Sequence, residues 1–557
     1  MVSGFKTESS REVPVTTVPP PAISYWPWIA FGAVLIAVAV IRARLLMIPL
    51  ERDEGEFAYM GQLMLHGIPP YKLAYNMKLP GIYAAYALIM SLFGQTIAGI
   101  RAGFLLVSLV STGIVFLLAR RLLSQSVAVT VSASFALLTV SRTVLGTSAH
   151  ATQFVLPFAL GGCLLLLKLR DTDRPVTALW SGIMFGIAIL MKQHAVFFVV
   201  FAALYIIYVY LSIRPAVLKP LMARVVLLLV GAAAPFVITC LALYAAGVFH
   251  NFWFWTLTYA RQYVSQFTPA QGVVILWYTF RKILGAGFWL WIMTALGLVA
   301  AISALFLDRK RRADMVFLVG FAFASFLCIC PGFFFRSHYF VLIMPAAGMM
   351  IGVFMMYCAK WLGRAAGPMI GFSIPAVIFI AALANSVYVQ RDFLFRADPE
   401  QACRMMYGFN PFPESMEIGD YIKKHSATTD TIAVIGSEPQ IYFYANRHSA
   451  TGIIYVYGLM EAQKYASEMQ RNMINEITLS KPRYIVFTNI PTSWLARSGS
   501  DMTIIQWTRD YLGKNYRFVG RSDAAVEGGS AATYWGVEAR THPPASRFNT
   551  LVFERKV

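Results

Sequence analysis

Long apolar runs fill most of the chain up to residue 390, and polar residues gather between them. Runs of about 17–25 apolar residues are long enough to cross a bilayer as helices. Eleven such runs occur, near residues 25–49, 97–119, 126–145, 150–168, 176–191, 195–213, 224–247, 284–307, 314–331, 339–360 and 367–389. The pattern predicts a polytopic α-helical membrane protein with about 11 spans. A shorter run, 80–94, predicts a helix that lies in the outer interface.

The composition supports a membrane protein. Of the 557 residues, 58% are hydrophobic and 13% are charged, whereas soluble domains carry about 25% charged residues. A soluble enzyme, a disordered chain and a fibrous protein are therefore excluded. The net charge of +20 fits basic residues that hold loops in the cytoplasm, and we expect no nucleic-acid partner. The polar, Pro-rich residues 1–24 are predicted to form a disordered cytoplasmic tail.

The distribution of Lys and Arg orients the predicted spans. With the N-terminus inside, nearly every basic pair or cluster in a short connection falls on the cytoplasmic side, as at 120–121, 168–174, 309–312 and 360–364. Counting 80–94 as a full span would break this pattern. The first outer loop, 51–96, and the C-terminal stretch, 391–557, are then predicted to be extracytoplasmic.

The C-terminal stretch has a different composition, because it holds 17 of the 27 acidic residues of the chain. Two β-like runs, Thr431–Gly436 and Arg483–Thr488, flank a helical stretch, Glu461–Leu479. Strands that alternate with helices predict a small α/β domain. The chain is thus expected to divide into the tail 1–24, a membrane domain 25–390 and a soluble domain 391–557. Four of its tyrosines are expected to pack on strand faces, with stacking on sugars as the alternative: Tyr442, Tyr444, Tyr455 and Tyr457.

Carboxylates are scarce in the membrane domain, with eight between residues 13 and 390. Four of them stand within six residues, just after the first span: Glu51, Asp53, Glu54 and Glu56. Like charges this close repel, and desolvation raises their pKa values, so the cluster requires nearby cations or a function. The alternative is a solvated loop. The following sequence, from Glu56 to His66, instead predicts an amphipathic helix.

Basic and polar side chains return to the same outer face from several distant connections. They are Tyr75, Lys78, Arg101, His150, Gln153, Lys192, Gln193, Arg261, Arg336, His338 and Tyr339. Each one alone also fits a helix end or a contact with lipid headgroups. Together they predict a single outward-facing site. A carboxylate there can accept the proton of an attacking hydroxyl, while Lys and Arg bind a phosphate that leaves.

Several motifs resemble the GT-C glycosyltransferases, and more closely the bacterial relatives of protein O-mannosyltransferases and of lipid A aminoarabinose transferases. They are the Asp53-Glu54 pair after the first span, Lys78-Leu-Pro80, Arg120-Arg121, Lys192-Gln193 and the late His338-Tyr339. The likeness covers roughly residues 30–390. It implies a GT-C membrane domain that carries catalysis, in a bacterial inner membrane, with membrane lipids around it.

The resemblance also implies a reaction. It is an inverting transfer of a sugar from a polyprenyl-phosphate donor to an extracytoplasmic acceptor, which is a lipid, a polysaccharide or a protein hydroxyl. Asp53 would act as general base with support from Glu54, and Lys78 would bind the donor phosphate. The remaining phosphate-binding candidates are Arg336, Arg261 and Lys192. The substrate-binding candidates are Tyr75, His150, Gln153, Gln193, His338 and Tyr339.

We expect no cofactor and no required metal. Some members of the superfamily carry another acid in the second outer loop, whereas this chain has Ser148-Ala-His150-Ala-Thr-Gln153 there. Two other functions are weighed. One is a transporter or flippase of lipid-linked sugars, which would need ionisable groups near the bilayer midplane. The other is a membrane anchor for a binding module. A single outward cavity that holds Asp53, Lys78 and Arg336 would favour the enzyme.

Overall fold

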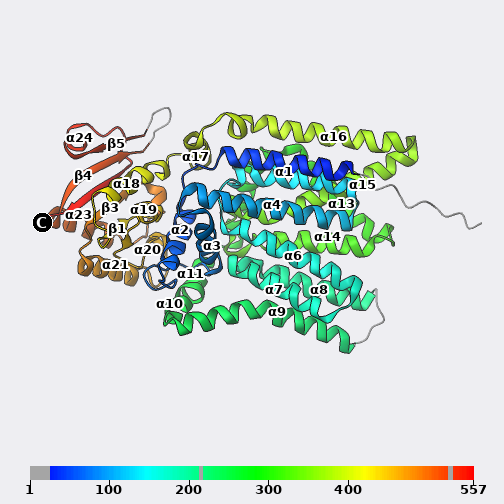
Figure 1. Cartoon of the computed structure of the whole chain (residues 1–557), viewed down its shortest axis with the longest axis horizontal. Coiled ribbons are helices and arrows are strands. Elements are labelled where there is room, and N and C mark those ends of the chain that lie inside the picture. The colour runs from blue at the N-terminus through cyan, green and yellow to red at the C-terminus, as the bar shows by residue number, and fades with distance from the viewer. Residues whose placement is uncertain (1–24, 213–217, 525–530, 557) are drawn as a thin grey trace, which may run out of the picture.

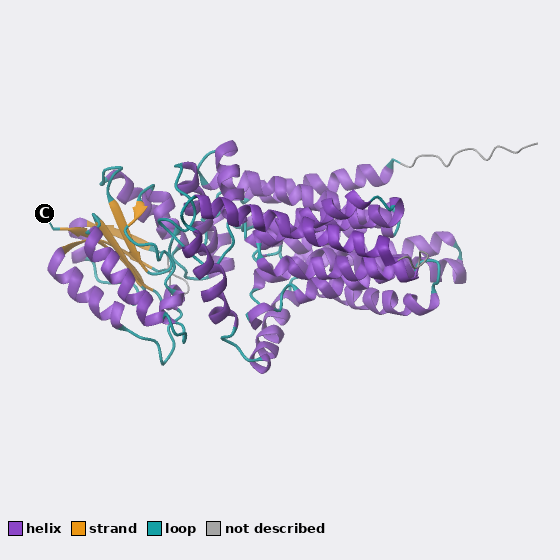
Figure 2. Ribbon diagram, turned by 90° about the horizontal axis from the view of Figure 1, so that it is seen from below, coloured by secondary structure: helices purple, strands orange, loops and turns teal. Residues whose placement is uncertain are grey.

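The computed structural model describes residues 25–212, 218–524 and 531–556. The predicted tail, 1–24, lies outside these residues. A long helical bundle forms one end of the molecule, and a compact domain with a β-sheet forms the other (Figures 1 and 2). We call the end of the bundle that meets this domain the domain end. The domain is built from the C-terminal part of the chain, and short helices of the first loop lie between it and the bundle.

Each of the predicted apolar runs coincides with a helix of the bundle. The helices are α1 (Trp26–Arg44), α4 (Ile97–Leu122), α5 (Gln125–Val140), α6 (Ala151–Thr172), α7 (Pro175–Met191), α8 (Val196–Ser212), α9 (Leu218–Ala245), α13 (Phe288–Leu307), α14 (Arg312–Leu327), α15 (Met344–Ala366) and α16 (Pro368–Val389). Within the described residues, eight helices are long and apolar enough to cross a membrane. The protein is therefore a multi-pass membrane protein. The exact number of spans stays a prediction, because α5, α7 and α14 are only 16, 17 and 16 residues long.

Glycines let the helices of the bundle approach closely. A Cβ atom on Gly182 of α7 would collide with the carbonyl oxygen of Leu228 of α9, and one on Gly231 would collide with that of Leu179. In a membrane, where lipid is as apolar as the helices, such close backbone packing replaces the hydrophobic effect as the force that holds helices together.

The first loop forms two helices, α2 (Arg52–Leu65) and α3 (Gly81–Phe93), at the domain end. Helix α3 matches the predicted short helix. Helix α2 begins at Arg52, four residues before the predicted start, because Glu51 and Glu54 form a capping box. The acidic cluster is therefore the first turn of this helix and not a loop. A second outer segment comprises α10 (Phe249–Trp253), the π-helix η3 (Phe254–Tyr259), α11 (Ala260–Val264) and α12 (Pro269–Leu284).

The C-terminal domain is an α/β domain, as predicted. Its six-stranded sheet has the order β2-β1-β3-β6-β4-β5, with β1 parallel to β2 and β3 and the remaining pairs antiparallel. The strands are β1 (Thr431–Ile435), β2 (His448–Ser449), β3 (Tyr484–Asn489), β4 (Tyr516–Asp523), β5 (Ala532–Trp535) and β6 (Asn549–Arg555). The helices are α17 (Pro399–Tyr407), α18 (Phe412–Lys424), α19 (Gln440–Ala445), α20 (Tyr457–Met460), α21 (Ala466–Ser480), α22 (Pro491–Trp494), α23 (Thr503–Asn515) and α24 (Gly536–Thr541).

Two of the sequence expectations for this domain need correction. The predicted helix Glu461–Leu479 begins later, at Ala466. The four tyrosines do not lie on strand faces: Tyr442 and Tyr444 belong to α19, while Tyr455 and Tyr457 follow in the segment around the start of α20.

Candidate active site

A cavity of about 430 Å³ lies where the bundle, the first loop, the second outer segment and the C-terminal domain meet. The predicted site residues that line it are Asp53, Tyr75, Lys78, Lys192, Gln193, Arg261, Arg336, His338 and Tyr339. Asp53, Lys78 and Arg336 thus share one cavity. The C-terminal domain contributes residues that the sequence did not assign to the site, including Tyr455 and Tyr457.

Lys78 joins two carboxylates at one wall of the cavity. Its Nζ atom lies 2.8 Å from Asp53 Oδ1 and 2.6 Å from Glu56 Oε2. Glu56 is fully buried and also accepts hydrogen bonds of 2.7 Å from Asn76 Nδ2 and the Tyr83 hydroxyl. Asp53 and Glu56 are three residues apart on α2, so both face Lys78. Glu56 was part of the acidic cluster but had no predicted role; the structure makes it an anchor for Lys78.

Glu54 lies on another face of α2 and does not reach the cavity. It is fully buried and pairs with Arg101 of α4, and it also accepts the backbone N–H of Ala149. Glu51 caps the helix and lies 3.5 Å from His150 Nδ1. Glu54 therefore fixes the helix against the bundle, and its predicted support of the site is mechanical.

Three cations of the cavity have no carboxylate partner among the described residues: Lys192, Arg261 and Arg336. Lys192 Nζ lies 4.2 Å from the ring centroid of Tyr339, which stabilises a cation without neutralising it. One Arg336 nitrogen lies 3.3 Å from the Tyr263 hydroxyl. Since Asp53 is the one acidic residue among those that line the cavity, the site has an excess of positive charge and suits an anion.

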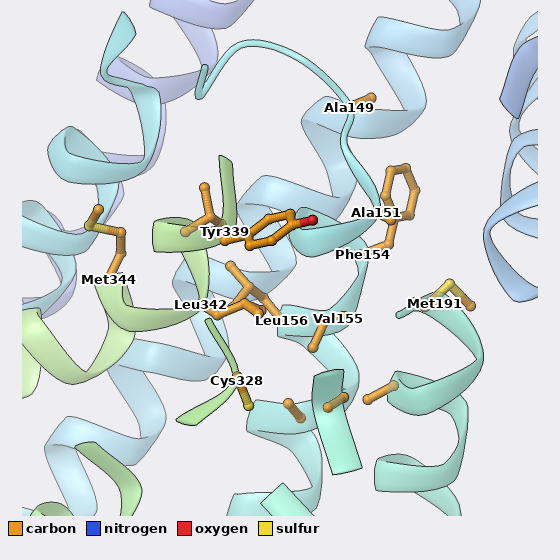
Figure 3. Close-up of a cluster of buried hydrophobic side chains, with 14 of the residues drawn as sticks. Ala149, Ala151, Phe154, Val155, Leu156, Met191, Cys328, Tyr339, Leu342 and Met344 are labelled. Carbon is orange, nitrogen blue, oxygen red and sulfur yellow. The ribbon is translucent and has the colours of Figure 1, made fainter. Parts of the chain in front are cut away.

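The segment η5 (Ser337–Ile343) brings His338 and Tyr339 to the site. In Figure 3, Tyr339 lies beside the start of α6, close to Ala151 and Phe154. His338 stacks on His150 with ring centroids 4.2 Å apart. Two of the predicted site residues, His150 and Gln153, do not line the cavity. His150 lies behind the lining, and Gln153 Nε2 donates to the Gly146 carbonyl oxygen at 3.3 Å.

Asp53, His150 and His338 offer ligand atoms within 4.8 Å of one another. Both ring nitrogens of His150 are buried without a hydrogen-bond partner among the described residues. A carboxylate and two imidazoles are a donor set that divalent transition metals accept. The residues therefore fit a metal, and the expectation that none is required stays a prediction.

Burial and neighbouring charges set the ionisation of the site. Burial raises the pKa of Glu51 well above its usual value, and the charge of Asp53 adds to this shift. Burial alone would raise the pKa of Asp53 too, but Lys78, together with His338 and His150, outweighs burial and lowers that pKa. Burial lowers the pKa of His150 to about 3 and that of Lys192 to about 7. At neutral pH Asp53 in the cavity is thus ionised, and the imidazole of His150 behind it is neutral.

An apolar groove lies next to the cavity. It lies between α8 and α14, has a volume of about 180 Å³, and is lined by residues such as Val200, Leu204 and Phe323. Phe197 at the start of α8 lines both the groove and the cavity. The groove and the charged cavity are therefore neighbours that share Phe197.

The bundle, the first-loop helices and the cavity define a polytopic membrane protein with a polar cavity at the domain end of the bundle. A family model described as dolichyl-phosphate-mannose-protein mannosyltransferase matches residues 78–239. Three solved structures resemble the whole chain. Archaeoglobus fulgidus oligosaccharyltransferase in the apo form is 11% identical with a TM-score of 0.53, and the alignment covers 94% of this chain and 76% of that one. The same archaeal enzyme, AglB, in complex with an inhibitory peptide and a dolichol-phosphate, gives 12% identity and a TM-score of 0.50 over the same shares, 94% and 76%.

ArnT from Cupriavidus metallidurans, bound to undecaprenyl phosphate, is 16% identical with a TM-score of 0.56, covering 84% of this chain and 94% of that one. No curated protein sequence matches the chain. At these identities the likeness concerns the fold. The protein has the GT-C fold of membrane glycosyltransferases, as the resemblance in the sequence predicted.

Proposed function

We propose that the protein is an inverting glycosyltransferase that moves a sugar from a polyprenyl-phosphate donor to a hydroxyl acceptor on the extracytoplasmic side. One observation carries this proposal: a carboxylate held by Lys78 shares a cavity with three cations that have no acidic partner in the part of the chain that the structure describes. A base for the acceptor and a cradle for a leaving phosphate are the two elements that such a transfer needs. The matched structures, two of which contain a polyprenyl or dolichyl phosphate, support the donor class.

Asp53 is the general base. Its Oδ1 atom is occupied by Lys78, so Oδ2 is the oxygen that takes the proton of the acceptor hydroxyl. The acceptor oxygen attacks the anomeric carbon from the side opposite the phosphate. The new C–O bond forms as the bond from carbon to phosphate oxygen breaks, and the configuration inverts. A donor phosphate that draws on Lys78 weakens the hold on Asp53 and thereby raises its basicity.

The cations stabilise the leaving group. A phosphodiester carries one negative charge, whereas the polyprenyl phosphate that leaves is a monoester with a second ionisation near pH 6. The additional charge therefore develops as the bond breaks. Lys192, Arg261 and Arg336 pair with no carboxylate of the described chain, so they stabilise the charged polyprenyl phosphate product more than the bound donor.

The apolar groove between α8 and α14 accommodates the lipid tail of the donor. It shares Phe197 with the cavity and lies between two of the predicted membrane spans. A tail in this groove would leave the phosphate in the cavity next to the cations. The transporter alternative lacks comparable support, because the charged groups that line the cavity lie at the domain end of the bundle.

The proposal is tested by a transfer assay with purified protein and polyprenyl-phosphate sugars, combined with mass spectrometry of glycolipids and envelope polymers from cells with and without the protein. Asp53→Asn should lower turnover by about 10³-fold or more, because the base is removed. The matched control is Asp308→Asn, an acid that pairs with Lys360 away from the cavity and should turn over normally. Normal turnover by Asp53→Asn would exclude Asp53 as the base.

A further inference from the structure

Helix α2 presents a third face to the C-terminal domain. Arg52, Gly55 and Tyr59 recur at helical spacing and all contact this domain. A Cβ atom on Gly55 would lie 2.5 Å from the backbone nitrogen of Gln440, so only glycine permits this approach. The Tyr59 hydroxyl accepts the backbone N–H of Ser449 at 2.7 Å. The domain is therefore packed against the helix that carries Asp53.

A buried ion pair forms the strongest link on this face. Arg52 donates from Nη2 and Nε to Glu438 Oε1, at 2.7 and 3.2 Å. Their side chains are 8% and 0% exposed. The other oxygen of Glu438 accepts from Gln440 Nε2 at 2.7 Å, and the Arg52 guanidinium lies 5.2 Å from the ring centroid of Phe412. Such a pair holds its partners in one geometry, since removing either charge leaves the other buried and unpaired.

The turn that carries Glu438 is also connected to the cavity. The Ser437 hydroxyl accepts the backbone N–H of Val456 at 3.1 Å, which ties the turn to the segment around Tyr455. The Tyr455 hydroxyl donates to Asp53 Oδ1 at 3.4 Å, and the Tyr455 ring lies 5.3 Å from Lys78 Nζ. The C-terminal domain thus reaches Asp53 by two routes, through its chain neighbour Arg52 and directly through Tyr455.

We propose that the C-terminal domain positions the general base, with Glu438 acting through Arg52 on the first turn of α2 and Tyr455 acting on Asp53 Oδ1. This inference rests on the proposed function. Lys78 and Tyr455 both hold Oδ1, which leaves Oδ2 as the oxygen that takes the proton of the acceptor. The domain is then a part of the transferase site and not a separate binding module.

The test compares Glu438→Gln with the wild type in the transfer assay. The variant keeps the shape of the side chain and removes its charge. We expect kcat to fall about tenfold or more while the KM for the donor stays within about twofold, because small displacements of a reacting group cost rate and not donor binding. The matched control is Glu554→Gln, a buried carboxylate paired with Arg483 and Arg517 in the same domain, which should keep the wild-type kcat. A wild-type kcat in a folded Glu438→Gln protein would overturn the proposal.

A double variant distinguishes a loss of positioning from a folding defect. Arg52→Met combined with Glu438→Leu removes both buried charges, which proteins often tolerate in stability. If this double variant unfolds at the wild-type temperature and still turns over about tenfold more slowly, the pair positions the base. Wild-type kcat in the double variant would reduce the pair to a structural contact and overturn the proposal.

Tyr455→Phe tests the second route, the direct contact of Tyr455 with Asp53. It should lower kcat about threefold without changing the donor KM.

Failure of the proposed function is distinguishable from failure of this inference. Binding of undecaprenyl phosphate, measured directly, reports the cation cradle and should be equal in the wild type and in Glu438→Gln. A wild-type protein that transfers no sugar from any polyprenyl-phosphate donor contradicts the function itself. A wild-type protein that is active, beside a Glu438→Gln variant with the same kcat, contradicts only the positioning role.

Discussion

The ionisation of Lys192 predicts how donor binding depends on pH. Lys192 lies between α7 and α8, has no acidic partner among the described residues, and burial lowers its pKa to about 7. The charges of Asp53, Lys78 and Arg336 act on it in the same cavity. Only the ammonium form attracts a phosphate, and a bound phosphate keeps the proton on. Donor affinity should therefore be highest below pH 7 and should fall as the pH rises above 7.

The size of the effect follows from the protonated fraction of the empty site. With a pKa of about 7, this fraction falls from about three quarters at pH 6.5 to about 3% at pH 8.5. Affinity should therefore weaken about 25-fold over this range. His150 does not contribute, because its pKa of about 3 leaves it neutral throughout. The donor does not contribute either, since a phosphodiester lacks the ionisation near pH 6 of a monoester.

The assay is equilibrium binding of a non-transferable polyprenyl phosphodiester to the purified protein, from pH 6.5 to 8.5. Lys192→Arg is the matched control, because a guanidinium stays charged over the whole range and should flatten the profile. Lys192→Ala should bind weakly at every pH. A wild-type affinity that stays constant from pH 6.5 to 8.5 would refute the assignment of Lys192 to the phosphate.

Three further predictions concern stability, metal and lipid. Glu54→Gln should destabilise the protein by about 3 kcal/mol in thermal unfolding, because it leaves the buried Arg101 without its charge partner. Chelation with EDTA should leave turnover unchanged, since Lys78 already neutralises Asp53; a loss that Zn²⁺ or Mn²⁺ restores would instead make Asp53 a metal ligand. Val200→Trp should fill the groove and raise the KM several-fold for a full-length polyprenyl donor but not for a two-isoprene donor. The control Val230→Trp, at a similarly exposed position outside the groove, should change neither KM.

Much of the architecture could be predicted because hydrophobic length is a strong signal. Every predicted apolar run has its helix, and β1 and β3 lie where the β-like runs stand. Strands β4 and β6 escaped prediction because both mix charged and apolar residues, as in Arg517-Phe518 and Phe553-Glu554. Strand β6 pairs with β3 over six residues and with β4 over seven. These long-range pairings, which no local pattern encodes, make β4 and β6 strands.

The contribution of the C-terminal domain to the site could not be predicted from the sequence. Tyr455 and Asp53 are 402 residues apart, and neither has a pattern that points to the other. Tyr442 is also a tyrosine that packs on α2, but it is fully buried and its ring stacks on Tyr59. Only the three-dimensional structure shows that Tyr455, and not Tyr442, contacts Asp53.

The acidic cluster illustrates why composition locates a site more readily than it assigns roles. Four carboxylates within six residues suggested one negatively charged centre. Helical geometry turns successive side chains by about 100°, so the four point in different directions. Glu51 caps the helix, Asp53 faces the cavity, Glu54 holds the bundle, and Glu56 holds Lys78. Each acid except Asp53 thus fixes the helix or the lysine beside it, and Asp53 is the one of the four that lines the cavity.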